Sequence, residues 1–269
     1  MRLREWFNIN KGVFKERDSN FLMNVFMNKR SVILPDDYIL NSYDLRYLTG
    51  VKSLYSKGWP IAYILRKEQF FGFDFFVEPG VLIPRPETEI ITEEALNIVN
   101  NNRAINSVLD LCCGTSCIAI VIAKHADRYL NIFASDINTR ALMVSRKNID
   151  FYKAPIQLIR SDLFSGFKKK AFDLIVTNPP YVETNNIKGS LSFEPEDALD
   201  GKEDGFYFIK NILMHASEYL RCNGYLIIEI GYNHYDLLDK FLKELGVYDI
   251  IKWIKDYSSY TRGVVLKRR

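Results

Sequence analysis

A rigid proline-containing turn, placed directly after an apolar run, carries the clearest chemistry in the sequence. The segment reads Phe172-Asp-Leu-Ile-Val-Thr-Asn-Pro-Pro-Tyr181. Each proline fixes its own φ, restricts the residue before it and lacks a backbone N–H. The stiff turn can aim the Asn178 side-chain oxygen and the Pro179 carbonyl at the two hydrogens of one planar amino group, while Tyr181 packs against the π-face of that group. A purely structural turn is the alternative interpretation.

Three earlier loops carry residues that suit a nucleoside. Asp110-Leu-Cys-Cys-Gly-Thr-Ser-Cys117 leads from a strand to a helix amino terminus, where backbone amides can approach a ligand closely. Asp136 follows the next strand, where doubly wound nucleotide-binding domains place an acid that holds a ribose diol. Asp162 and Leu163 follow the third strand, where a carboxylate can accept from an adenine amino group and an apolar side chain can flank the ring. An ordinary turn, a helix cap and an Asx turn are the respective structural alternatives.

Strands and helices that alternate after residue 104 would position these loops. The expected strands are 107–111, 131–135, 156–160, 172–177, 225–230, 249–254 and 263–267, and the expected helices are 118–125, 139–152, 205–220 and 236–245. This alternation predicts an α/β fold with βαβ units in a largely parallel sheet, helices on both faces and an antiparallel last pair. Because ligands bind beyond the carboxyl ends of such strands, the four polar loops should meet at one edge.

The amino-terminal part has a different pattern. Apolar residues recur at helical spacing through 21–27 and 38–48, with Pro35 and Asp36 expected to begin one helix, so residues 1–68 predict a small helical domain. The aromatic run after residue 68 predicts a β-hairpin linker over 69–84. A helix should open around Pro86, with acids in its first turn, at the start of a main domain over 85–269.

Composition narrows the class of protein. The 269 residues include 36 Lys and Arg against 33 Asp and Glu, a net charge of +3 that is modest for a protein that must neutralise many phosphates. Three of the four cysteines fall within 112–117 and only three histidines are present, which favours neither a disulfide framework nor a metal site. The chain lacks a signal-peptide pattern and an apolar run of about 20 residues. We therefore expect a cytoplasmic protein that binds no metal and no membrane.

Further motifs resemble one known family. They are Pro60-Ile-Ala-Tyr-Ile64, Phe71-Gly-Phe-Asp-Phe75, Pro79-Gly-Val-Leu-Ile-Pro-Arg-Pro-Glu-Thr-Glu89, Glu194-Pro195, Ala198-Leu-Asp-Gly201, Glu203-Asp-Gly205 and Glu229-Ile-Gly231. With the Asn-Pro-Pro-Tyr turn, they closely resemble the HemK/PrmC family of release factor glutamine methyltransferases over roughly residues 59–269. Residues 1–58 resemble this family only in length and helical character.

The resemblance implies a Rossmann-like class I methyltransferase that uses S-adenosyl-L-methionine and releases S-adenosyl-L-homocysteine. The acceptor would be the side-chain amide nitrogen of the glutamine in the Gly-Gly-Gln loop of peptide chain release factors, and the helical domain would recognise that partner. The resemblance implies that the cofactor is bound by three groups of residues: the methionine part by Cys112, Cys113, Gly114, Thr115 and Ser116, the ribose by Asp136, and the adenine by Asp162 and Leu163. It implies that the glutamine is held by Asn178, Pro179, Pro180 and Tyr181, with Asn178 also bordering the cofactor. Of these four residues, Asn178, Pro179 and Tyr181 would be catalytic. We expect a monomer without a direct nucleic-acid partner.

One departure from the family pattern concerns the cofactor loop. The family sequence Gly-Thr-Gly-Ser-Gly is replaced by Cys112-Cys-Gly-Thr-Ser116, so two of the three glycines are lost. A non-glycine residue costs about 1 kcal/mol or more where φ must be positive. The sequence therefore predicts a working but weakened cofactor site.

Two other functions fit parts of the sequence. A methyltransferase acting on an exocyclic amine of adenine or guanine in RNA or DNA would also use such a turn, although the chain has no large extra domain to read a nucleic-acid sequence. A non-catalytic scaffold would follow if the altered loop no longer bound the cofactor. A measurement of cofactor binding would test the scaffold function. Methyl transfer to release factor or to RNA would distinguish the two enzymatic functions.

Overall fold

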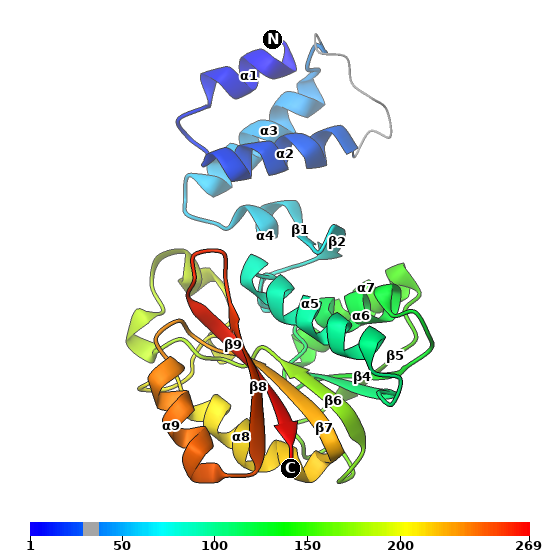
Figure 1. Ribbon diagram of the computed structural model, residues 1–269. Coiled ribbons are helices and arrows are strands. Elements are labelled where there is room, and N and C mark those ends of the chain that lie inside the picture. The colour runs from blue at the N-terminus through cyan, green and yellow to red at the C-terminus, as the bar shows by residue number, and fades with distance from the viewer. Residues whose placement is uncertain (29–37) are drawn as a thin grey trace. The chain divides into compact units, whose positions relative to one another are not determined.

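The computed structural model describes residues 1–28 and 38–269, which divide into two compact units, Met1–Lys67 and Glu68–Arg269 (Figure 1). The helix start expected at Pro35 and Asp36 lies outside the described residues. Within the described part of the chain, no helix combines the length and the apolar character needed to cross a membrane.

The first unit is helical. It contains α1 (Leu3–Ile9), α2 (Glu16–Asn28), α3 (Ser42–Tyr55) and α4 (Ile61–Leu65), around a core that includes the fully buried Leu22 and Leu48. The helix expected from residue 38 begins later, because the Asn41 side chain accepts from the backbone N–H of Asp44 while Asp44 accepts from the backbone N–H of Asn41. Such a capping box satisfies N–H groups at the helix start and sets its first residue.

The hairpin expected as a linker belongs to the second unit. Its strands are β1 (Lys67–Phe70) and β2 (Phe73–Phe76), and the division between the units falls at the start of β1. Phe70 and Phe75 are fully buried in the same core as Ile91 of α5 (Pro86–Asn101). Burial of these aromatic rings makes the hairpin part of the domain core.

A seven-stranded sheet forms the centre of the second unit. Its strands are β3 (Ser107–Leu111), β4 (Asn131–Asp136), β5 (Ile156–Arg160), β6 (Phe172–Thr177), β7 (Leu220–Glu229), β8 (Tyr248–Lys255) and β9 (Thr261–Arg268). Their order is β5-β4-β3-β6-β7-β9-β8, with β9 antiparallel to both β7 and β8 and the other pairs parallel. The predicted α/β class and the antiparallel last pair are confirmed. β7 begins earlier than predicted, with a register shift opposite β6.

Two helical layers cover the sheet (Figure 1). One contains α5, α6 (Cys117–His125) and α7 (Thr139–Tyr152), and the other contains α8 (Tyr207–Tyr219) and α9 (Tyr235–Leu245). Successive strand residues point to opposite faces, so Val108 packs into the first core and Leu109 into the second. The segment between β6 and α8 contains three short 3₁₀ helices, η1 (Thr184–Asn186), η2 (Gly189–Phe193) and η3 (Glu196–Ala198).

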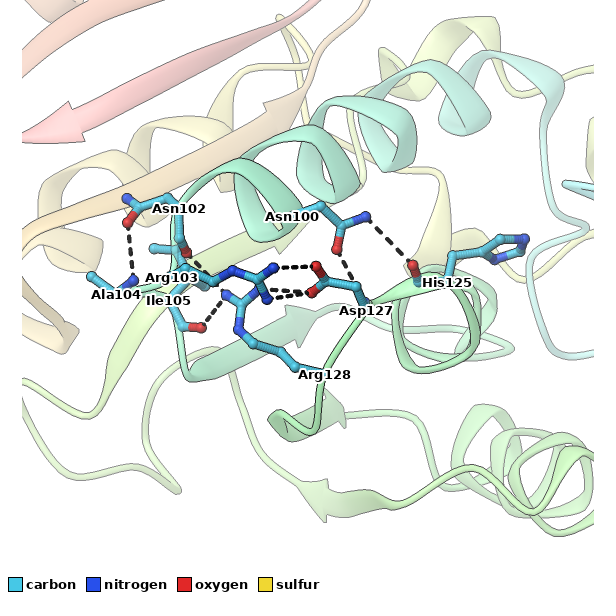
Figure 2. A network of polar contacts seen from close by, with 8 residues as sticks. All are labelled: Asn100, Asn102, Arg103, Ala104, Ile105, His125, Asp127 and Arg128. Carbon is cyan, nitrogen blue, oxygen red and sulfur yellow. Dashed lines mark hydrogen bonds and ion pairs between the residues drawn. The ribbon is translucent and has the colours of Figure 1, made fainter.

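The amino-terminal edge of the sheet is held by a polar network (Figure 2). The Arg128 guanidinium donates to the backbone carbonyls of Asn102 at 2.9 Å and Ile105 at 2.7 Å, and it pairs with Asp127. These contacts join the loop that precedes β3 to the loop that precedes β4. They fix the starts of two strands whose opposite ends carry the candidate site.

Candidate active site

A cavity of about 360 Å³ lies at the carboxyl edge of the sheet, within the second unit. β4 and β6 flank β3 on opposite sides, so the chain order reverses at β3 and the loops after these strands diverge. The cavity is lined by all four loops singled out in the sequence, by residues 80–82, 84, 85 and 88, and by part of the segment that follows β6. Its size is within the usual range for a small-molecule site.

The loop after β3 has the backbone conformation that glycine normally supplies. Cys112 and Ser116 both have φ of +60°, and Gly114 has φ of +52°. The two positions at which this chain lacks the glycine of the family pattern are therefore held in the left-handed region, each at a cost of about 1–2 kcal/mol. Ser145 of α7 supports this loop, because its hydroxyl donates to the Gly114 carbonyl and accepts from the Ser116 hydroxyl, both at 2.8 Å.

A second support comes from the buried Asp110 at the end of β3. Its Oδ2 accepts from the backbone N–H of Ala119 in the first turns of α6, and its Oδ1 has no hydrogen-bond partner among the described residues. Burial raises the pKa of Asp110 to about 8. This side chain joins the strand to the helix that follows the loop.

Asp136 joins the loops that follow β3 and β4. Its Oδ2 accepts from the backbone N–H of Gly114 and its Oδ1 from that of Asn138, both at 2.9 Å. Burial raises the pKa of this carboxyl, while the two N–H donors act in the opposite direction. Each carboxylate oxygen keeps lone-pair capacity for a further donor, such as a hydroxyl of a ribose.

The third loop presents Asp162 and Leu163 to the cavity. Ser161 shapes it, since the Ser161 hydroxyl donates to the Leu163 carbonyl at 2.7 Å and accepts from the backbone N–H of Gly166 at 2.9 Å. Leu163 has φ of +43°. The turn is therefore built by a serine rather than by an Asx side chain.

The turn after β6 lies across the cavity from these loops. Asn178 and Pro180 line the cavity, whereas Ser116, Pro179 and Tyr181 are not among its described lining residues. The Asn178 Nδ2 group donates to the Thr88 hydroxyl oxygen at 2.9 Å, and Oδ1 has no partner in the described part of the chain. The Tyr181 hydroxyl donates to Glu229 Oε1 at 2.9 Å. Burial, followed by the neighbouring Glu229, raises the pKa of Tyr181 well above its usual value.

Two residues of this arrangement were not among the predicted site residues. Thr88 is 3% exposed and belongs to the Arg-Pro-Glu-Thr-Glu motif at the start of α5, and Glu229 is fully buried at the end of β7. The available signal for Glu229 was a charged residue directly after the apolar run 226–228, in the motif Glu229-Ile-Gly231. Thr88 carried no signal by itself.

Polar contacts also hold the segment after β6 beside the cavity. Glu194 is buried, pairs with Arg85 at 2.5 Å and accepts from the backbone N–H of Ile83 at 3.1 Å. The Asn138 side chain donates to Asp197 Oδ2 at 2.8 Å. These contacts connect the segment to both sides of the cavity.

Comparisons with known proteins show that this fold is the fold of methyltransferases. Residues 88–194 match the family model "Methyltransferase small domain". A methyltransferase from Pyrococcus furiosus has a similar structure, with a TM-score of 0.55 and 18% identity over 85% of this chain and 98% of that chain. The 16S rRNA N2 G1207 methyltransferase of T. thermophilus, solved with AdoMet and guanosine, gives a TM-score of 0.51 and 17% identity over 76% of this chain and 50% of that chain. Both structural similarities show that the fold is shared.

Sequence relatives are more specific. The release factor glutamine methyltransferase of Buchnera aphidicola is 32% identical over 100% of this chain and 99% of the relative. That of Borreliella burgdorferi is 38% identical over 79% of this chain and 74% of the relative. The ribosomal protein uL3 glutamine methyltransferase of Francisella tularensis is 37% identical over 67% of this chain and 59% of the relative. At these identities and lengths, the chain belongs to the release factor glutamine methyltransferase family.

Proposed function

We propose that this chain transfers a methyl group from S-adenosyl-L-methionine to the side-chain amide nitrogen of the glutamine in the Gly-Gly-Gln loop of peptide chain release factors. The observation that carries this proposal is the state of Asn178: its Nδ2 is bound by Thr88, and its Oδ1 is free to accept beside a cavity that suits a nucleoside. Membership of the family supports the choice of glutamine as acceptor.

The residues around the cavity fit S-adenosyl-L-methionine. Asp136 is oriented by two backbone N–H groups and can accept from the ribose hydroxyls, and Asp162 and Leu163 line the cavity and would flank the adenine. The Ser135 hydroxyl also lines the cavity, is buried and has no partner among the described residues, which leaves it available to a ligand. The residues at 112–116 would hold the methionine part. When bound, the cofactor supplies an electrophilic methyl group on a sulfonium.

In-line alignment is the main task of the protein side chains. The lone pair of an amide nitrogen is delocalised into its carbonyl, so this nitrogen is a weak nucleophile. Asn178 Oδ1 and the Pro179 carbonyl would accept the two N–H hydrogens of the glutamine, orient the nitrogen and favour the positive charge that develops on it. The methylated amide can then lose its proton to water, and this scheme requires no general base.

The cysteine-rich loop is compatible with an electrophile nearby. Burial raises the pKa of the Cys112 thiol far above its usual value, and it raises the pKa of the Cys117 thiol to about 12. The thiolate is the nucleophilic form of cysteine. Both thiols therefore stay protonated near neutral pH and do not compete with the glutamine for the methyl group.

The first unit would recognise the release factor. It has its own core, and it lies outside the part of the chain that matches the methyltransferase family model. A release factor as partner implies a cytoplasmic enzyme, and the net charge of +3 favours a protein rather than a nucleic acid as the direct substrate. We expect the enzyme to act as a monomer.

Transfer of tritiated methyl groups to purified proteins tests the proposal. Release factor should be labelled, while release factor with the Gly-Gly-Gln glutamine changed to alanine, ribosomal protein uL3 and total RNA should not. Labelling of uL3 or RNA in place of release factor would refute the proposed substrate. Asn178→Ala should lower kcat about 100-fold or more, by analogy with the loss of one transition-state hydrogen bond, and calorimetry should show S-adenosyl-L-methionine affinity close to that of the wild type. Near-normal turnover by this variant would refute the role of Asn178.

A further inference from the structure

A buried serine of α7 lies against the cofactor loop and uses every hydrogen-bonding position of its hydroxyl. Ser145 is fully buried, and its hydroxyl donates to the Gly114 carbonyl at 2.8 Å. The Ser145 oxygen also lies 2.8 Å from the Ser116 hydroxyl oxygen and 3.6 Å from the Cys113 sulfur. A hydroxyl can donate one hydrogen and accept through two lone pairs. These three contacts therefore match the full capacity of the Ser145 hydroxyl.

The Gly114 carbonyl fixes the direction of the other two contacts. A carbonyl can only accept, so it takes the single hydrogen of the Ser145 hydroxyl. Ser145 must then accept hydrogens from Ser116 and from Cys113. Burial raises the pKa of the Cys113 thiol well above its usual value, so this thiol keeps the hydrogen that it donates. Ser116 and Cys113 together hold the Ser145 hydroxyl in the orientation that binds Gly114.

Gly114 connects these side chains to the acid that would bind the ribose. Gly114 has φ of +52°, and its N–H donates to Asp136 Oδ2 at 2.9 Å while its carbonyl accepts from Ser145. Both of its backbone polar groups are therefore engaged, one by the carboxylate and the other by a side chain of α7. Glycine has access to more backbone conformations than any other residue, so these two bonds decide where its N–H points.

Ser116 adopts φ of +60°, a region that is strained for a residue with a Cβ atom. Its backbone is held on both sides, because its N–H donates to the Cys113 carbonyl at 2.7 Å and its carbonyl accepts from the N–H of Ile120 at 3.0 Å. A glycine here would relieve the strain and would also remove the hydrogen that Ser116 gives to Ser145. Strain lowers the stability of the folded chain, whereas order in the loop favours ligand binding, since less conformational freedom is lost on binding. The serine should therefore act on stability and on affinity in opposite directions.

We propose that Ser116 and Ser145 are a pair of positioning residues for the cofactor: together they fix Gly114, and through its N–H they aim the Asp136 carboxylate at the ribose of S-adenosyl-L-methionine. This inference rests on the cofactor site described under the proposed function and is independent of which methyl acceptor is used. It predicts that the serine at position 116 strengthens cofactor binding even though it replaces a glycine of the family pattern.

Calorimetric titration of the full chain with S-adenosyl-L-homocysteine tests the pair. Ser116→Ala removes the donated hydrogen and should raise the dissociation constant about three- to tenfold. Ser145→Ala should raise it about tenfold or more, because all three contacts of the hydroxyl are lost. In Ser145→Ala the Ser116 hydroxyl has already lost its acceptor, so the addition of Ser116→Ala should change the dissociation constant less than about twofold.

Ser116→Gly separates the effect on affinity from the effect on stability. It should raise the dissociation constant as Ser116→Ala does, while urea unfolding should show it to be at least as stable as Ser116→Ala, because glycine tolerates φ of +60°. Tyr152→Phe is the matched control: Tyr152 also lies on α7, and its hydroxyl donates to a backbone carbonyl outside the cofactor loop, that of Asp74 at 2.7 Å. The dissociation constant of this control should stay within about twofold of wild type.

Titrations with adenosine and with 2′,3′-dideoxyadenosine show whether the pair acts through Asp136. The wild type should bind adenosine about tenfold more tightly, since only adenosine has ribose hydroxyls for the carboxylate, and Ser145→Ala should reduce this preference to about threefold or less. A preference that is absent in the wild type, or unchanged in Ser145→Ala, would overturn the inference.

Two further outcomes for the pair would also overturn it. One is a dissociation constant for S-adenosyl-L-homocysteine within about twofold of wild type in both Ser116→Ala and Ser145→Ala, and the other is a double variant in which the two single effects multiply. A wild-type chain that shows the expected binding pattern but does not label the release factor would support this inference and overturn the proposed function.

Discussion

Asn148 of α7 connects the hairpin to the cofactor loop, and replacing it tests how much these contacts contribute. Asn148 is fully buried and makes three hydrogen bonds. Its Oδ1 accepts from the backbone N–H of Phe76 at 2.8 Å, and its Nδ2 donates to the carbonyls of Phe76 at 3.1 Å and Thr115 at 3.2 Å. Asn148→Leu keeps a similar volume and removes all three bonds.

The expected loss of stability follows from the groups left behind. One backbone N–H and two backbone carbonyls would be buried without these partners, at about 1–3 kcal/mol for each unsatisfied group. The added apolar surface of leucine offsets part of this, by about 1.5–3 kcal/mol. We expect a net loss of about 3 kcal/mol in the free energy of unfolding of the second unit, together with weaker cofactor binding because Thr115 belongs to the loop at 112–116.

Amide hydrogen exchange measured by mass spectrometry on peptides from β3 and β6 reports the unfolding free energy of this unit directly. Asn211→Leu is the control, since Asn211 is partly exposed on α8 and makes one hydrogen bond, to the Tyr207 carbonyl. The control should change stability by about 0.5 kcal/mol or less. A loss below about 1 kcal/mol in Asn148→Leu, or one equal to that of the control, would refute the reasoning.

Four other outcomes are expected. Asp136→Asn should weaken S-adenosyl-L-methionine binding at least about tenfold by calorimetry, because an NH₂ group then replaces one acceptor; unchanged affinity would exclude the ribose contact. Cys112→Val should destabilise the second unit by about 2 kcal/mol in the exchange assay, because a β-branched residue is strained at φ of +60°, while Cys112→Gly should stay within about 1 kcal/mol of wild type. Burial raises the pKa of Glu229 from 4.5 to about 7, so the folded state binds this proton more tightly than the unfolded chain, and a contribution of about 3 kcal/mol is present below pH 4.5 and lost as the pH rises through 7. Glu229→Gln should therefore gain stability relative to wild type between pH 5 and pH 8 in urea unfolding, and an unchanged difference would contradict this. The exposed Cys222 should react rapidly with a thiol reagent in the native protein, and equally fast modification of Cys113 or Cys117 would contradict the burial of these two cysteines.

Local patterns in the sequence were sufficient for the architecture of the second unit. Short apolar runs followed by helical periodicity predicted all seven strands of the sheet, and the predicted bounds of β3, β5, β6 and α7 agree with the structure. The physical reason is that strand and helix periodicities are encoded by neighbouring residues, and parallel connections allow few topologies. The loop composition also predicted that the polar residues would gather at one edge.

The positive φ values in the cofactor loop could be predicted only conditionally. Replacement of glycine raised the question of strain, but the sequence could not say whether Cys112 and Ser116 adopt the left-handed region. The structure shows that both do. Ser145 supports them from α7, and that contact depends on how the helix packs over the loop.

Contacts between distant parts of the chain decided the rest. The segment 69–84 was predicted to be a linker, but two aromatic side chains of its hairpin are fully buried, so the hairpin belongs to the core of the second unit. Thr88 and Asn178 are 90 residues apart, and Tyr181 and Glu229 are 48 residues apart. The sequence by itself predicted roles for Asn178 and Tyr181 from the rigid turn that contains them. Which side chains orient them depended on the register of β6 against β7 and on the packing of α5, because hydrogen-bond partners of a buried group are set by three-dimensional proximity rather than by any local pattern.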